Sequence, residues 1–248
     1  AAGRRRWRGA SAASFRGGLG AGPKGGVVGV ESPALPRRRG RRRVEKALTH
    51  QVVDVRRRGA FGEAIAGDDI DTMLDFFTTD PGSKIIGLEV SARRALLDEA
   101  VEEASKENAA IAMMDETPRF LMVQEYVEVN DLIEANVVGA LNSSYAFYTG
   151  LIDGGAMPAG VTAESALQDV WSREPEVRND TTEWVYSFLM MAYQPLTDEE
   201  LTAYIDFSKS EAGQDMGDAL FVAFDGMFDD VSRGLGLASS RFMISQEL

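Results

Sequence analysis

The sequence predicts an all-α fold, a helical bundle built from two similar helix–break–helix units around a long central helix. Three observations indicate this. Apolar residues recur at spacings of three and four through most of residues 61–248. The signals of β-strands are nearly absent: there is almost no run of alternating apolar and polar residues, and no Asn-Gly or Asp-Gly turn between β-branched segments. One stretch of sequence also occurs twice at a constant offset.

The composition excludes several familiar kinds of site. The absence of cysteine excludes disulfides, thiolate metal sites and a cysteine nucleophile. His50 is the only histidine, which excludes clusters of histidines around a metal and argues against a Ser-His-Asp triad. No run approaches 18 apolar residues, so we expect no membrane-spanning helix. We expect no metal and no cofactor.

Charge is divided unevenly along the chain. Residues 1–60 contain 16 Lys and Arg against 3 Asp and Glu, a net charge of +13. Residues 61–248 contain 10 basic and 36 acidic residues, a net charge of −26. The basic segment is rich in Gly, Arg, Ala and Pro and has no helical or strand period. Three interpretations stay open: a disordered segment, a basic arm that binds nucleic acid or an anionic membrane, and out-of-frame translation of a GC-rich gene. Residues 61–248 are predicted to form one all-α domain.

The first predicted helix has one apolar face, made by Ile70, Met73, Leu74 and Phe77. Asp80-Pro81 then combines an N-cap with proline at the first helical position, which predicts a new helix. Its apolar stripe predicts a helix that runs to about Lys106. A longer pattern follows Thr117-Pro118, with positions spaced alternately by four and three: Val123, Val127, Asn130, Glu134, Val137, Leu141, Ser144, Tyr148 and Leu151. Residues 118–152 are therefore the predicted central helix.

The C-terminal part contains the clearest helix start. A short helix is expected over about 163–171, and the next helix, "TTEWVYSFLMMAY", is closed by Pro195. In "PLTDEEL", Thr197 and Glu200 have the spacing of a capping box, and Leu196 and Leu201 that of a hydrophobic staple. The last helical pattern begins at Gly213 and is expected to end near Gly234.

The repeated stretch reads "LDFFTTDPGSKI" at residues 74–85 and "IDFSKSEAGQDM" at residues 205–216. The aligned pairs are Asp75 with Asp206, Phe76 with Phe207, Thr79 with Ser210 and Gly82 with Gly213. The pattern predicts an acidic-capped helix, a break and a second helix, over about 66–101 and 197–232. We expect the glycine to allow a close helix approach or to relieve the backbone, and the phenylalanine to fill the joint. We interpret the motif as structural rather than catalytic.

The segment "LTDEELTAYIDFSKSEAGQDM" resembles the helical unit of the bacterial domain-of-unknown-function 2059 family, and "LDFFTTDPGSKI" resembles the same unit again. The similarity extends over about residues 61–245. It implies an all-helical, exported or periplasmic protein of Gram-negative bacteria without an established activity. No signal peptide is visible in this sequence, and the Arg/Gly-rich segment stands where the family has one.

The sequence favours a non-enzymatic binding or scaffold module of the bacterial cell envelope, with an unknown protein partner. One alternative is a metal-independent hydrolase or lyase that uses carboxylates of the helix at residues 125–134. Its weak catalytic candidates are Glu134 and Asn130, because they lie at i, i+4 on an otherwise apolar stripe, where burial would raise the pKa of the carboxyl. A solvated acidic face explains the same residues. A second alternative is nucleic-acid binding by the basic arm.

Overall fold

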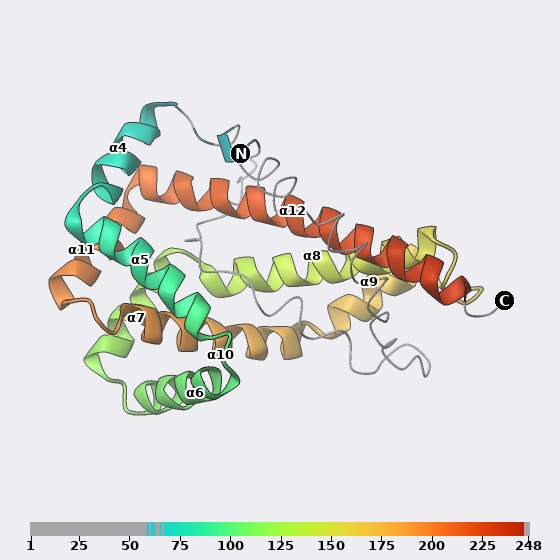
Figure 1. The fold of residues 1–248 in the computed structure, drawn as a ribbon, viewed down its shortest axis with the longest axis horizontal. Helices are drawn as coiled ribbons and strands as arrows, with labels where there is room; N and C mark the ends of the chain where they lie inside the picture. Colours follow the sequence, from blue (N-terminus) through green and yellow to red (C-terminus); the bar gives the residue numbers. More distant parts are fainter. Residues whose placement is uncertain (1–58, 60, 63–64, 66, 246–248) are drawn as a thin grey trace, which may run out of the picture. The chain divides into compact units, whose positions relative to one another are not determined.

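The structure is a computed structural model that describes residues 59, 61–62, 65 and 67–245 (Figure 1). Apart from residue 59, the basic segment lies outside these ranges. The described ranges contain helices and no strand, which confirms the all-α prediction. The helices are α4 (Gly67–Phe77), α5 (Asp80–Ala95), α6 (Glu99–Met114), α7 (Pro118–Val129), α8 (Leu132–Asp153), α9 (Ala163–Ser172), α10 (Glu174–Tyr193), α11 (Asp198–Lys209) and α12 (Glu211–Ile244). Among these helices, none combines the length and the apolar character that crossing a membrane requires.

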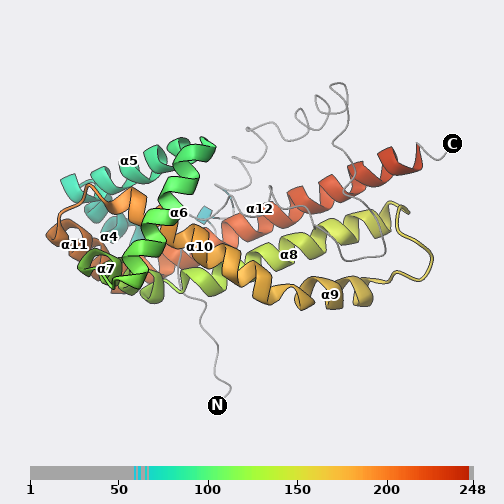
Figure 2. The same cartoon turned by 90° about the horizontal axis from the view of Figure 1, so that it is seen from below.

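The described residues form two compact units. Unit 1 contains residues 61–136 and 178–222, and unit 2 contains residues 137–177 and 223–245. In unit 1, α11 packs against α7 and α5, α4 packs against α5, and α6 packs against α7 (Figures 1 and 2). In unit 2, the backbones of α8 and α12 come together where Gly150 faces Gly236: a Cβ on Gly150 would lie 3.0 Å from the Cα of Gly236.

The helix predicted from Asp80 to about Lys106 is wrong, because the chain forms two helices there. Leu96 caps the C-terminus of α5, and the Asp98 carboxylate accepts hydrogen bonds from the N–H groups of Ala100 (2.9 Å) and Val101 (3.3 Å). An aspartate in this position satisfies the free N–H groups of a new helix and so favours a break. The start of α5 also differs by one residue, since Thr79 and not Asp80 is its N-cap.

The single central helix predicted over residues 118–152 is also wrong. It divides into α7 and α8 at Asn130 and Asp131. Asp131 has a positive φ of 48°, a backbone conformation that Asn and Asp adopt more readily than other non-glycine residues. Asn130 caps α7, and its side-chain amide donates to the carbonyl of Tyr126 at 2.8 Å. The predicted stripe therefore combines faces of two different helices.

The other helix predictions differ mainly at their ends. The capping box of Thr197 and Glu200 is confirmed, and the α9 prediction agrees within one residue. Helix α10 begins earlier than expected, at Glu174. Helix α12 continues ten residues beyond the predicted end at Gly234, to Ile244. Glycine inside a helix costs only about 1 kcal/mol, so it does not by itself end one.

The two predicted joints have the same hydrogen bonds. The hydroxyl of Thr79 donates to the carbonyl of Phe76 at 2.6 Å and accepts from the N–H of Gly82 at 3.3 Å. The hydroxyl of Ser210 donates to the carbonyl of Phe207 at 2.6 Å and accepts from the N–H of Gly213 at 3.1 Å. Helices α11 and α12 also begin 131 residues after α4 and α5, respectively.

The joint glycines lie where two helices meet. A Cβ on Gly82 would lie 2.8 Å from the Cα of Phe77, and one on Gly213 would lie 2.9 Å from the Cα of Ser208. Neither glycine has a positive φ. This geometry fits the close-approach interpretation and does not require backbone relief.

The joint phenylalanines pack against each other. The rings of Phe76 and Phe207 are stacked with centroids 4.3 Å apart and an interplanar angle of 11°. Phe77 adds an edge-to-face contact to Phe207 at 5.3 Å. The two joints thus pack their equivalent aromatic residues together in unit 1, with Phe207 buried and Phe76 partly buried.

We expect Gly82→Ala and Gly213→Ala each to lower the free energy of unfolding of this chain by about 1–3 kcal/mol, because the added methyl group meets backbone that cannot rotate away. Urea denaturation followed by circular dichroism measures this. Gly226→Ala on α12 is the matched control, since no atom lies within 4 Å of a Cβ built there. It should be neutral or stabilising. A neutral result at both joints would contradict the close packing.

Candidate functional site

The two catalytic candidates from the sequence do not form a buried acid–base site. Asn130 is 3% exposed, but its amide is bonded to the backbone of Tyr126 at the end of α7. Glu134 lies on α8, beyond the break, with 47% of its side chain exposed. Its carboxylate accepts from the guanidinium of Arg178 at 2.7 Å. Glu134 therefore fits the solvated acidic face better than a general acid or base.

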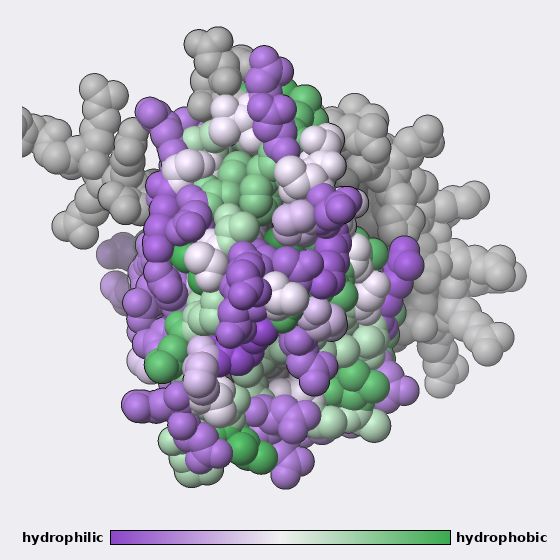
Figure 3. All heavy atoms as spheres, turned by 90° about the vertical axis from the view of Figure 1, so that its left-hand side faces the viewer, coloured by the Kyte–Doolittle hydropathy of each residue, from purple (hydrophilic) through white to green (hydrophobic). Residues whose placement is uncertain are grey.

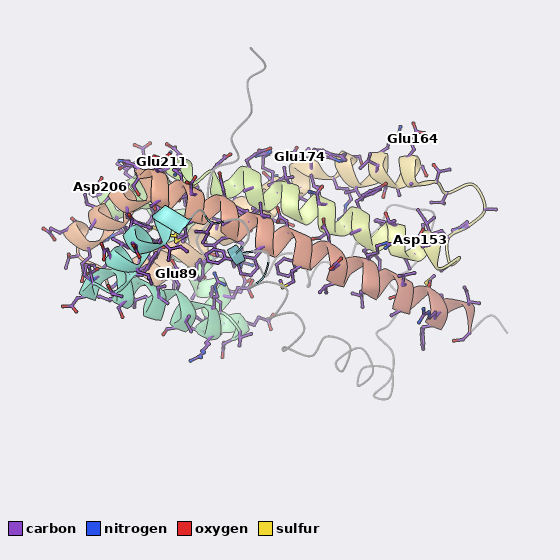
Figure 4. The ribbon with its side chains drawn as sticks, turned by 90° about the horizontal axis from the view of Figure 1, so that it is seen from above. Glu89, Asp153, Glu164, Glu174, Asp206 and Glu211 are labelled. Atoms are coloured by element: carbon purple, nitrogen blue, oxygen red, sulfur yellow. The ribbon has the colours of Figure 1, made fainter. Side chains whose placement is uncertain are left out.

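A buried polar cluster of unit 1 includes Glu89, which the sequence did not predict and which is labelled in Figure 4. Glu89 lies on α5 and is 6% exposed. Its carboxylate accepts from the hydroxyl of Tyr193 at 2.7 Å and from that of Tyr204 at 3.5 Å. The hydroxyl of Tyr126 donates to Tyr204 at 3.1 Å. We call Glu89, Tyr126, Tyr193 and Tyr204 the tyrosine cluster, and it joins α5, α7, α10 and α11.

Arg93 lies one turn after Glu89 on α5. Its guanidinium lies over the ring of Phe188, 5.2 Å from the centroid, a cation–π contact. Its Nε and Nη2 atoms are buried without a hydrogen-bond partner. The positive charge of Arg93 therefore compensates Glu89 through space, while the tyrosine hydroxyls make the direct hydrogen bonds.

The electrostatics of the tyrosine cluster follow from its burial. Desolvation raises the pKa of Glu89, and the hydrogen bond from Tyr193 and the charge of Arg93 oppose this shift. Burial also raises the pKa of Tyr193 well above its usual value, so this phenol stays protonated and remains a donor. Tyr126, Tyr193 and Tyr204 are each at most 2% exposed. A substrate in solvent cannot reach these groups, and the cluster acts as a polar cross-link between helices.

The sequence contained a signal for this cluster. Glu89 lies four residues after Ile85 and three before Ala92, on the apolar stripe that predicted α5. A carboxylate on a buried stripe requires donors from neighbouring helices. What the sequence could not supply was the identity of the donors, since Tyr193 and Tyr204 come from helices about one hundred residues later.

One flank of α5, beside the buried stripe that contains Glu89, is apolar and open to solvent. Ile86, Val90 and Leu97 are 49%, 43% and 63% exposed, and their spacing places them on one side of the helix or its C-terminal end. Gly87 and Arg94 lie among them and are also exposed. We call these five residues the α5 outer face. On α4, Ile70 and Leu74 are exposed as well. Figure 3, which views the side where α4 and α11 lie in Figure 1, shows hydrophobic side chains between hydrophilic ones.

A second group of acids lies between α8 and α12 within unit 2. Desolvation, with the nearby charge of Asp229, raises the pKa of Asp225 to about 6. Asp225 lies against Gly139, where a Cβ would be 2.8 Å from its Oδ1. The hydroxyl of Ser143 lies 3.4 Å from the carboxylate of Asp229. Across the part of the chain that is described, no group of three or more His, Asp or Glu residues could hold a metal ion.

Removing the strongest donor of the tyrosine cluster tests its structural role. We expect Tyr193→Phe to lower the free energy of unfolding by about 1–3 kcal/mol, because Glu89 would lose its shortest hydrogen bond while remaining buried. The deficit should grow as pH rises through the pKa of Glu89, since the phenol stabilises the carboxylate more than the neutral acid. Urea unfolding at several pH values measures both effects. Glu89→Leu combined with Tyr193→Phe completes a double-mutant cycle, and a coupling near zero would contradict the cross-link.

Asp225 predicts a pH dependence of stability. Its folded-state pKa of about 6 exceeds the value of about 3.9 for an unfolded aspartate, so the folded chain prefers the neutral acid. The contribution of Asp225 to stability is therefore fully present below about pH 4 and is lost as pH rises through about 6. Asp225→Asn should unfold at a higher temperature than the parent chain at pH 7.5, by about 2–4 °C if it gains about 1 kcal/mol. The gain should vanish near pH 4. Asp71→Asn, at an exposed position on α4, is the control, and an equal gain at both pH values would contradict the assignment.

The comparisons with known proteins found no matching family model, no matching curated protein and no matching solved structure. The functional inference therefore depends on the residues of this chain: the closed tyrosine cluster of unit 1 and the exposed apolar residues of the α5 outer face.

Proposed function

We propose that this chain is a non-enzymatic binding module that docks a partner protein on the α5 outer face. The α5 outer face carries this proposal, because it presents three large apolar side chains to solvent: Ile86, Val90 and Leu97. Apolar residues scattered singly over a surface need no explanation, but an aligned group is typical of an interaction site. The partner contact would remove these side chains from water.

The polar groups support binding over catalysis. The tyrosine cluster is closed to solvent, and Glu134 is an exposed member of an ion pair with Arg178. A hydrolase or lyase needs an acid or base within hydrogen-bond reach of its substrate. Neither Glu89 nor Glu134 offers both burial and access. Nucleic-acid binding by the basic arm concerns residues outside the described ranges, except residue 59.

The proposed location is the bacterial cell envelope. It rests on the resemblance of "LTDEELTAYIDFSKSEAGQDM" to the domain-of-unknown-function 2059 family. The equal hydrogen bonds at the two joints support the related proposal that residues 66–101 and 197–232 are copies of one helical unit. A protein of this family would meet its partner outside the cytoplasm.

Affinity capture of the tagged full chain from its native host, after mild cross-linking, tests the binding function. We expect the parent chain to recover a specific partner and Ile86→Glu to reduce the recovery by about tenfold or more, as for a contact at the centre of an interface. Leu167→Glu, at an apolar α9 residue that is 39% exposed, should recover the partner normally. Circular dichroism checks that both variants fold. Equal recovery by both variants, or no specific partner at all, would refute the proposal.

A further inference from the structure

The α5 outer face has a local charge that differs from the rest of the domain. Residues 61–248 carry a net charge of −26, yet three of their ten basic residues, Lys84, Arg93 and Arg94, lie on α5. Lys84 is paired with Glu200 at 2.6 Å, and Arg93 compensates the buried Glu89. Arg94 is exposed and has no ion pair among the described residues. A complementary surface would therefore place a carboxylate opposite Arg94.

The shape of the α5 outer face suits another helix. Ile86 and Val90 are one turn apart on α5, and Leu97 extends the apolar side at the end of the helix. Gly87 lies at the edge of this group, and no heavy atom lies within 4 Å of a Cβ built there. The backbone of a second helix can approach closely over a glycine. A helix offers no free ladder of backbone hydrogen bonds to an added strand, so helix-on-helix packing is the favoured mode.

The second joint shows this mode of packing at the matching position. With the offset of 131 residues, Arg94 corresponds to Asp225 on α12. Asp225 is covered by α8, because its carboxylate lies against Gly139. Val90 corresponds to Phe221, which packs against the core of unit 1. These two positions are partly buried after the second joint, whereas Val90 and Arg94 are exposed after the first.

We infer that the α5 outer face receives one amphipathic helix of a partner protein, with apolar residues over Ile86, Val90 and Leu97 and a carboxylate opposite Arg94. This inference rests on the proposed binding function and specifies the chemistry of its partner. The same contact predicts different effects for two glycine variants, Gly87→Leu on the α5 outer face and Gly226→Leu on α12. Gly87→Leu should block the helix approach, although leucine is the better helix former in free α5.

Photo-cross-linking tests the inference. In the full chain, the exposed Ser91 is replaced by the photo-reactive residue p-benzoylphenylalanine. After irradiation in the native host, mass spectrometry should identify partner residues spaced by three and four within one segment that contains Asp or Glu. Arg94→Glu should lower the cross-link yield by about tenfold, and Lys at the partner's carboxylate position should restore it. Gly87→Leu should abolish the cross-link while keeping or raising the melting temperature. Gly226→Leu, at an exposed α12 glycine with the same open space, should leave the yield unchanged.

Two outcomes would overturn the inference while leaving the binding function intact. One is a partner whose cross-link yield is insensitive to Arg94→Glu and Gly87→Leu. The other is a cross-link from Ser91 to a second copy of this chain, which would make the face a self-association surface. If the parent chain captures nothing, the proposed function itself fails. The experiment therefore separates the failure of the helix partner from the failure of binding.

Discussion

The burial of the Glu89 carboxylate is the constraint on which the packing of unit 1 depends. A carboxylate that is 6% exposed is tolerated only when donors reach it, and here they come from Tyr193 and Tyr204. Tyr193 is the last residue of α10, and Tyr204 lies in the middle of α11. The hydrogen bonds to Glu89 therefore fix both helices against α5. We infer that these directed hydrogen bonds favour one register of the two helices against α5.

The same cluster connects the two joints. Tyr204 is bonded to Glu89 and also stacks on Phe76, with ring centroids 5.8 Å apart. Phe76 in turn stacks on Phe207. The polar and aromatic parts of the core are therefore continuous, and the caps at Thr79 and Ser210 turn each chain segment so that its phenylalanine enters this core. The motif is structural in this sense: each joint contributes one aromatic ring and one close helix contact.

The features that could be predicted from the sequence were those that depend on neighbouring residues. The capping box at Thr197 and Glu200, and the close approach at Gly82, are decided within a few positions of the chain. The break at Asn130 and Asp131 was not predicted, because the regular apolar spacing over residues 118–152 indicated one continuous helix. Asn and Asp tolerate a non-helical backbone, and this local preference ends α7 there. The partners of Glu89 were missed for a different reason. Hydrogen bonds that join residues about one hundred positions apart are decided by tertiary packing, which periodicity does not encode.

The arrangement of α5 explains why its outer face is the more informative surface. An ordinary surface helix buries its apolar side and exposes its polar side. Helix α5 buries Ile85 and Ala92 in this way, but it also buries the Glu89 carboxylate. It leaves Ile86 and Val90 exposed, and the exposed Leu97 follows its C-terminus. Buried polar groups and aligned exposed apolar groups are the two departures from the usual pattern that carry information. The buried group is fully accounted for by the packing of unit 1, because Tyr193 and Tyr204 satisfy it. No contact within the described residues covers Ile86, Val90 and Leu97, and a helix of another protein would remove these side chains from water.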